Sequence, residues 1–256
     1  MSEADAPDTA DPGAQLTQRL TSAERERRWP NVRPRDAATL IVLDRSGPEP
    51  KVLMGRRHAA LAFMPGQFVF PGGRIEPGDR RMVAAGALHP RAAAALDARV
   101  VRPSAARSRA LALAAIRDTF EETGLLIGTR DDGAAARAPE GAWAAFCGHG
   151  VVPDLGAVTL VARAITPPRR PRRFDTRFFA VDRAAIAGEV AGLIGPEAEL
   201  VELVWVDLAR AAELQCPTIT QVILDELRDR LAGGFAQDLP IPFYYEQRGR
   251  FVRELL

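Results

Sequence analysis

The chain has 256 residues, of which 47% are hydrophobic and 26% are charged. This composition allows one large domain, or one domain with extensions, and it excludes a chain that is disordered throughout. The formal net charge is +1, so we expect no strong attraction of the whole molecule to nucleic acid or to a membrane.

The two cysteines, Cys147 and Cys216, lie far apart, and neither belongs to a C-x-x-C motif. This spacing argues against a disulfide framework and against a zinc site, so we expect a cytoplasmic location. The first 35 residues lack the apolar segment of a secretory signal. No apolar run reaches the length of about 18 residues that suggests a membrane span.

In the first half of the chain, the sequence predicts a flexible N-terminal tail followed by strands. Residues 1–35, rich in Ala, Asp, Pro, Thr and Arg, are expected to form a mobile tail with a helical piece over 22–29. Segments 37–44 and 51–57 are expected to form a β-hairpin, because β-branched residues flank the turn SGPEP. Residues 67–79 read as a short strand that enters a loop rich in glycine and proline.

Helices follow that loop. Residues 80–103, rich in Ala and Arg, are expected to form small helices. A longer helix is predicted from Ala105 to Thr123, with Ser104 as its N-cap and Gly124 at its C-terminal stop.

The second half of the chain is again predicted to contain both strands and helices. We expect a short helix within 141–150, strands within 156–166, 172–182 and 199–209, an amphipathic helix over 218–234, and docked extended structure over 241–255. Mixed strands with interleaved helices indicate the α/β or α+β class. We predict an α/β/α sandwich with a mixed sheet between the helix at 106–123 and the helix near 218–232.

The long predicted helix ends in the stretch RDTFEETG, which concentrates negative charge. Asp118, Glu121 and Glu122 cluster on one side, because residues three and four apart are neighbours on a helix. Like charges at this spacing repel by about 0.2–0.5 kcal/mol per pair, and the C-terminal end of a helix also disfavours anions. A divalent cation would turn this repulsion into attraction. The alternative is a solvated acidic face with Arg117 in a surface ion pair.

The upstream stretch FPGGRIEPGD decides between these readings. Gly72 and Gly73 allow a loop to pass close to a ligand. Together the two stretches resemble the Nudix box, G-x5-E-x7-R-E-U-x-E-E-x-G-U, where U is a bulky aliphatic residue. The matching positions in this chain are Gly73, Asp79, Arg117, Asp118, Glu121, Glu122, Gly124 and Leu125.

The chain departs from this motif at several points. Asp79 and Asp118 each stand where the family has Glu, and Thr119 stands where an aliphatic residue is usual. Residues 80–116 carry an insertion, with 37 residues where the motif has seven. Such an insertion costs little, because closure entropy grows only logarithmically with loop length. We expect residues 80–103 to form a helical excursion beside the mouth of the site, where it would shape access and take no part in the chemistry.

The insertion, with the stretches FMPGQFVFPGG and ITPPRRPRRFDTRFF, also resembles the acyl-CoA diphosphatase subgroup of the Nudix hydrolases. The resemblance predicts a division into a tail at 1–35, a Nudix hydrolase domain at 36–215, and a C-terminal helix with a docked tail at 216–256.

The resemblance implies metal-dependent hydrolysis of a diphosphate bond in a nucleoside diphosphate linked to another moiety. Mg²⁺ or Mn²⁺ would neutralise the diphosphate and activate a water. Asp118, Glu121 and Glu122 would be the metal ligands, with Glu121 also available to the base system. Arg117 would hold a carboxylate by a fork-like pair, and Asp79 would complete the contact between loop and helix.

Residues outside the helix are expected to contribute less directly. Arg56, Arg57, Gly72, Gly73 and Arg173 are predicted to bind substrate, although the arginine run around Arg173 could equally be a solvated face. The general base is expected on another loop, at Glu197, Glu199 or Glu202.

The sequence does not distinguish among several substrates: CoA or acyl-CoA, ADP-ribose, NADH and dinucleoside polyphosphates. The alternative to an enzyme is a catalytically silent Nudix fold that binds a nucleotide or a partner protein. We expect a small-molecule nucleotide substrate, no nucleic-acid or membrane partner, and a homodimer as one option.

Overall fold

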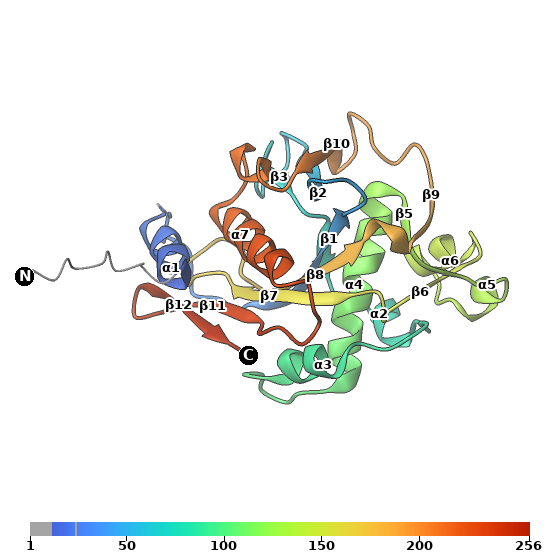
Figure 1. The fold of residues 1–256 in the computed structure, drawn as a ribbon, viewed down its shortest axis with the longest axis horizontal. Coiled ribbons are helices and arrows are strands. Elements are labelled where there is room, and N and C mark those ends of the chain that lie inside the picture. Colours follow the sequence, from blue (N-terminus) through green and yellow to red (C-terminus); the bar gives the residue numbers. More distant parts are fainter. Residues whose placement is uncertain (1–11, 24) are drawn as a thin grey trace, which may run out of the picture.

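The structure is a computed structural model that describes residues 12–23 and 25–256 (Figure 1). Residues 1–11 and 24, which belong to the predicted tail, lie outside the described residues. The helices are α1 (Pro12–Ser22), α2 (Pro77–Arg81), α3 (Pro90–Asp97), α4 (Ala105–Thr123), α5 (Ala134–Arg137), α6 (Ala142–Cys147) and α7 (Thr218–Ala232). None of the described helices combines the length and the apolar character needed to cross a lipid bilayer.

A mixed sheet forms the middle of the molecule. Its strands are β1 (Arg35–Asp44), β2 (Lys51–Arg57), β3 (Phe68–Val69), β4 (Gly72–Arg74), β7 (Thr159–Ile165), β8 (Phe174–Asp182), β10 (Leu200–Asp207), β11 (Pro242–Gln247) and β12 (Arg250–Leu255). The order is β10-β2-β1-β8-β7-β11-β12, with β3 paired to β2 and β4 paired to β1. A smaller sheet has the order β6-β5-β9, formed by Val151–Pro153, Leu125–Arg130 and Ile186–Glu189.

The large sheet is covered on both faces, which explains the continuous apolar run in β1. Successive side chains of a strand point to opposite faces. Leu40 and Val42 join the core on the α4 side, and Ile41 and Leu43 join the core on the α7 side. The predicted α/β/α sandwich with a mixed sheet is therefore confirmed (Figure 1).

Helix α4 confirms the predicted continuous helix and its stop. Gly124 ends it in the left-handed conformation at φ 79°, and the Gly124 N–H donates to Phe120 O over 2.8 Å. Ser104 occupies the predicted N-cap position, but its side chain makes no capping hydrogen bond.

The insertion begins within α2 and contains α3, and α3 does not lie where we expected. The Ser108 hydroxyl donates to Asp97 over 2.8 Å, which fastens the end of α3 to the N-terminal half of α4. Glu122 is a further fourteen residues along α4, or about 20 Å at 1.5 Å per residue. The expectation that the excursion stands beside the mouth of the site is wrong for α3, which lies at the other end of α4 (Figure 1).

The N-terminal helix is packed against the rest of the fold. The Arg19 guanidinium pairs with Asp225 of α7, and Thr21 Oγ1 accepts a hydrogen bond from the Phe251 N–H of β12 over 3.0 Å. Leu16 and Leu20 join the core on the α7 side. The helix lies over residues 12–22 and not over 22–29 as predicted.

The C-terminal residues extend the large sheet. Strand β11 pairs in parallel with β7 and antiparallel with β12. The expected docked extended structure over 241–255 is thus a β-hairpin at the sheet edge. The division of the chain into three regions stays a prediction.

Candidate functional site

The glycine loop reaches the acidic helix because two of its residues lack a Cβ. Strand β4 pairs with β1, with Gly72 opposite Thr39. A Cβ on Gly72 would lie 2.4 Å from the Ala38 carbonyl oxygen, and a Cβ on Gly73 would lie 2.7 Å from Asp118 Oδ1. A side chain at position 72 would meet the backbone of β1, so only glycine fits there, and a side chain at position 73 would displace the Asp118 carboxylate.

The Arg117 side chain, only 3% exposed, connects the loop to two acids of the helix. Its Nε donates to Asp79 Oδ1 over 2.9 Å, and its Nη1 donates to Glu121 Oε2 over 2.6 Å. Its Nη1 and Nη2 also reach the two carboxylate oxygens of Asp118, over 3.1 and 3.2 Å. Burial alone would lower the pKa of Arg117, but the Asp79 and Asp118 carboxylates raise it above its ordinary value.

Asp79 is completely buried and accepts a hydrogen bond that the sequence did not predict. The Trp143 Nε1–H donates to Asp79 Oδ1 over 2.9 Å, and the Glu76 N–H donates to Asp79 Oδ2 over 2.7 Å. Trp143 belongs to α6, 64 residues further along the chain. In the sequence, Trp143 is recognisable only as an aromatic residue within a predicted short helix. That feature does not indicate which residue accepts a hydrogen bond from its indole N–H.

Asp118 lies in a buried position that disfavours its charge. Burial raises the pKa of Asp118 to about 7; the Arg117 guanidinium opposes this shift and the Glu121 carboxylate adds to it. The Glu121 side chain itself is 45% exposed and turns to Arg117. Asp118 and Glu121 therefore differ in environment although both contact the same arginine.

Glu122 is the second acid whose charge is disfavoured. Burial raises its pKa well above the ordinary value, and the Glu199 and Asp118 carboxylates raise it further. The Gly72 N–H, which donates to Glu122 Oε2 over 3.3 Å, and the Arg57 guanidinium act in the opposite direction. Within the described residues Asp118 and Glu121 are paired with Arg117, whereas Glu122 forms no ion pair and lies beside the glycine loop.

Among the three residues predicted as a general base, Glu199 has the clearest relation to this charge. It pairs with Arg57 over 2.9 Å, and its charge acts on Glu122. Glu202 pairs with Arg56 over 2.6 Å where both side chains are exposed, and Glu197 is exposed. The structure brings Glu199 and Arg57 towards the acidic helix.

Arg173 is engaged elsewhere. Its Nη1 donates to Asn31 Oδ1 and to the Val32 carbonyl oxygen, both over 2.7 Å, and its Nε donates to the Thr166 carbonyl oxygen over 3.0 Å. These contacts fasten the segment before β1. The structure therefore places Arg173 with that segment and not with the acidic helix.

Whether the acids of α4 could hold a metal ion depends on how their carboxylate oxygens are arranged and paired. Within the described residues, no three His, Cys, Asp or Glu side chains converge so that they could hold a metal ion together. Arg117 accounts for this arrangement, because it draws Asp118 and Glu121 to itself. The oxygen donors of Asp118 and Glu122 nevertheless suit Mg²⁺ or Mn²⁺, since a cation would relieve the unfavourable charge of both carboxylates.

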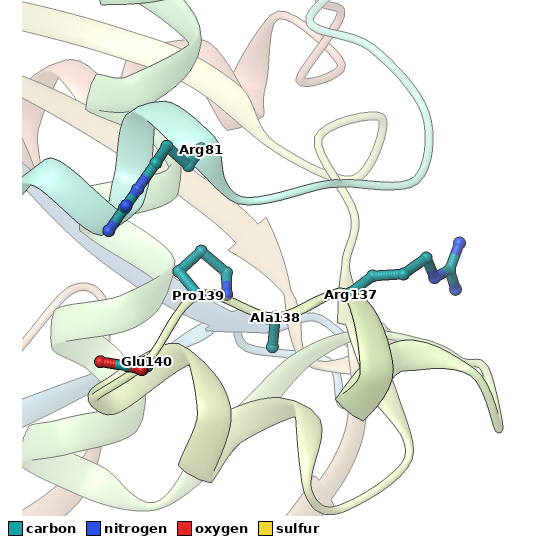
Figure 2. A pocket seen from close by; sticks show the side chains of 5 residues that line it. All are labelled: Arg81, Arg137, Ala138, Pro139 and Glu140. Atoms are coloured by element: carbon teal, nitrogen blue, oxygen red, sulfur yellow. The ribbon is translucent and has the colours of Figure 1, made fainter.

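A surface hollow of about 440 Å³ lies away from these acids. It is lined by Arg81, Arg137, Ala138, Pro139 and Glu140 (Figure 2). In Figure 2 the Arg137 side chain points away from those of Arg81 and Glu140, and Arg137 pairs with Asp131. The charged groups do not converge, so we do not assign the site to this hollow.

Known structures share this fold. The crystal structure of a NUDIX hydrolase from Alicyclobacillus acidocaldarius is 28% identical, with a TM-score of 0.55, and the likeness covers 76% of this chain and 90% of that chain. The Nudix hydrolase RenU from M. smegmatis is 17% identical with a TM-score of 0.42, covering 78% of this chain and 86% of that one. The NUDIX domain of Shewanella oneidensis NrtR, in complex with ADP ribose, is 12% identical with a TM-score of 0.43, covering 84% and 97%.

The RenU and NrtR likenesses are too distant to carry an argument. No protein-family model matches the sequence, and no curated protein matches it. The sandwich fold, the glycine loop packed on the acidic helix, and the likeness to the Alicyclobacillus hydrolase together show that the chain is similar to Nudix hydrolases in fold and in the arrangement of these residues.

Proposed function

We propose that the chain hydrolyses a diphosphate bond in a nucleoside diphosphate linked to a second group, with Mg²⁺ or Mn²⁺ as cofactor. The observation that carries this proposal is that Asp118 and Glu122 lie together beside the glycine loop, in surroundings that disfavour the charge of both carboxylates. A structural helix gains nothing from buried carboxylates that repel each other. CoA or acyl-CoA, ADP-ribose and NADH are the substrates to test first.

Each residue of the site has a role in this proposal. When bound, the divalent ion supplies charge neutralisation and an activated water. Asp118 and Glu122 would hold it, and Glu121 would serve a second ion or the base system. Arg117 keeps the Asp118 carboxylate in place, and Asp79 in turn orients Arg117.

Residues from β2 and the segment before β10 would act on the substrate side. Arg57 lies next to Glu199 and would contact the phosphate oxygens. Glu199 is our choice of general base over Glu197 and Glu202, because its charge acts on Glu122. It would accept the proton of the attacking water.

A catalytically silent Nudix fold is the second candidate, and one observation favours it. The acids do not converge as a ligand set, since Arg117 holds two of them. Such a protein would bind a nucleotide diphosphate without cleaving it.

A hydrolysis panel separates the two candidates. The full chain is incubated with CoA, acyl-CoA, ADP-ribose, NADH and dinucleoside polyphosphates in Mg²⁺ or Mn²⁺, and the products are separated by chromatography. We expect cleavage of at least one substrate at its diphosphate bond. Binding of a nucleotide in calorimetry with no cleavage of any substrate would contradict the enzyme and support the silent fold.

A further inference from the structure

A second hollow, of about 420 Å³, lies directly beside the glycine loop. Its lining comes from the start of β1, the end of β4 and the beginning of α2: Arg35, Asp36, Arg74, Ile75, Glu76, Pro77 and Arg80. This volume lies within the range of pockets that bind small molecules. The hollow contains none of the residues that the proposed reaction uses.

Three arginines at this hollow are free. Arg35, Arg74 and Arg80 are exposed, and within the described part of the chain their side chains have no hydrogen-bond or ion-pair partner. They come from three separate segments. An anion in the hollow could therefore recruit these guanidinium groups without breaking an existing pair.

The Asp36 carboxylate at the hollow, whose side chain is 28% exposed, is already paired with arginine. Asp36 accepts from Arg107 Nε over 2.7 Å and from Arg177 Nη1 over 3.1 Å. Arg177 is fully buried, and its Nε and Nη2 have no partner in the described structure. Arg177 also pairs with Asp175 over 3.1 Å, and Asp175 pairs with Arg163 over 2.7 Å, so three arginines surround the two carboxylates Asp36 and Asp175. Glu76, the other carboxylate of the lining, lies 3.8 Å from Arg117. The excess of one positive charge behind Asp36 adds to the attraction for an anion.

The position of the hollow relates it to the acidic helix. Arg74 directly follows Gly73, which packs against Asp118. From Gly72 to Arg74 the strand advances about 7 Å, at 3.3 Å per residue. A nucleotide whose diphosphate lies at the acids could therefore place another group in the hollow.

We propose that this hollow binds a phosphate monoester that the substrate carries apart from the diphosphate bond under attack. The inference rests on the proposed function and narrows its substrate class to nucleotides with such an additional phosphate. Arginine favours phosphate because its planar group donates two parallel hydrogen bonds to the oxygens.

Two pairs of compounds test this inference, because the members of each pair differ by one phosphate monoester: CoA with dephospho-CoA, and NADPH with NADH. We expect kcat/KM to be roughly tenfold to a hundredfold higher for the phosphorylated member, mainly through KM, as a charge-assisted hydrogen bond would give. Calorimetric affinities without metal should show the same order.

Matched variants locate the effect. Arg80→Gln and Arg74→Gln should each reduce the preference for the phosphorylated member. Arg81→Gln, next in sequence but at the other hollow, should retain it. Loss of preference in Arg81→Gln but not in Arg80→Gln would overturn the assignment.

The failure of this inference is distinguishable from failure of the proposed function. Equal kcat/KM and equal affinity for both members of each pair would overturn the phosphate site and leave the hydrolase standing. If no compound is cleaved, the proposed function fails, and the calorimetric comparison still decides the phosphate site: tighter binding of CoA and NADPH supports it, and equal binding overturns it.

Discussion

Arg117 shows how a single side chain joins two separate parts of the site. Its guanidinium binds Asp79 on one side and Asp118 with Glu121 on the other. Asp79 in turn depends on the indole N–H of Trp143. The orientation of Asp118 is therefore connected, through Arg117 and Asp79, to Trp143 of α6.

We expect Trp143→Phe to weaken the site while retaining the fold. The substitution removes one donor to a buried carboxylate, which costs about 1–3 kcal/mol of unfolding free energy. Mn²⁺ affinity, measured by electron paramagnetic resonance, should fall, and activity should fall at non-saturating metal. Trp205→Phe is the control, because Trp205 is 36% exposed. Unchanged Mn²⁺ affinity in Trp143→Phe would show that the indole is only a packing group.

Glu122→Gln should abolish hydrolysis without unfolding the protein. The variant loses a repelling charge next to Asp118 and Glu199, so its metal-free melting temperature should stay level or rise. Added Mn²⁺ should stabilise the wild type more than the variant, by mass action. The rate should fall by orders of magnitude, roughly 100-fold or more, because the metal supplies the activated water.

The control for that experiment is Glu213→Gln, which changes an exposed acid paired with Arg210. Its rate and its response to Mn²⁺ should equal those of the wild type. Equal hydrolysis by Glu122→Gln and wild type at matched metal would remove the acidic helix from the reaction.

The raised pKa of Asp118 predicts how stability depends on pH. Its pKa is about 7 in the folded protein and 3.8 in the reference state, so the folded protein binds more protons between these values. Raising the pH through this window therefore lowers the unfolding free energy of the metal-free protein. The raised pKa of Glu122 acts in the same direction.

Urea unfolding at a series of pH values between about 4 and 8 checks this prediction. Asp118→Asn should flatten the dependence, because the amide does not titrate. Saturating Mn²⁺ should reverse the trend, since metal competes with protons for the same oxygens. An identical slope in wild type and Asp118→Asn would show that Asp118 does not titrate in this window.

At the scale of single elements, the end of α4 is determined by one glycine. Gly124 has φ 79°, and a Cβ there would lie 2.1 Å from the Val190 carbonyl oxygen. The Val190 N–H donates to Gly124 O over 2.9 Å, next to the point where Leu125 of β5 pairs with Glu189 of β9. The helix end and the small sheet are thus fastened at one point.

Gly124→Ala should destabilise the protein by more than the roughly 1–2 kcal/mol that left-handed backbone costs an ordinary residue, because the methyl group also meets Val190. Gly192→Ala separates the two causes, since Gly192 has φ 88° but nothing within 4 Å of its added Cβ. Urea midpoints compare the variants. A loss in Gly124→Ala no larger than in Gly192→Ala would rule out the steric part.

Local signals explain which elements were predictable. The β1–β2 hairpin and α4 follow from residues adjacent in sequence, such as the turn SGPEP and the terminal Gly124. The location of α1 and α3 depends on distant partners, Asp225 and Ser108, and the sequence contains no pattern for these contacts.

The residues of the site also fall into two groups, those that local sequence signals predicted and those whose roles depend on distant contacts. The motif indicated that Arg117 would hold a carboxylate and that Asp79 would join loop and helix, and the hydrogen bonds agree with this geometry. Trp143 and Arg35 lay outside the motif, and Arg74 and Arg80 occupy positions for which the motif specifies no residue type. Arg173 was selected for its charge, but backbone carbonyl groups, which no sequence pattern reveals, engage its donors.

At the scale of the whole molecule, the sheet separates two cores. The core on the α4 side supports the acidic helix, and the core on the α7 side holds α7 and α1. Leu20, which is 2% exposed, belongs to the second core. We therefore expect that a substitution in the core on the α7 side lowers the stability of the protein without moving the residues of the site.

Leu20→Ala should lower the unfolding free energy by about 2–5 kcal/mol, the usual loss for a buried leucine. Mn²⁺ affinity and kcat, measured well below the melting temperature, should remain those of the wild type. Leu113→Ala, on the α4 side, should lower both stability and Mn²⁺ affinity. A fall in Mn²⁺ affinity for Leu20→Ala would show that the two cores are coupled.

The excursion between loop and helix has a consequence for the order of folding. It separates Asp79 from Arg117 by 38 positions. Closing a loop about five times longer than the uninterrupted motif costs about 1.5 kcal/mol more in chain entropy. Helix α4 needs only local hydrogen bonds, so we expect it to form before the loop joins it. Because α4 depends on local hydrogen bonds and the contact of α2 with it depends on closing a long loop, we also expect brief openings of the native state in which α2 detaches while α4 stays intact.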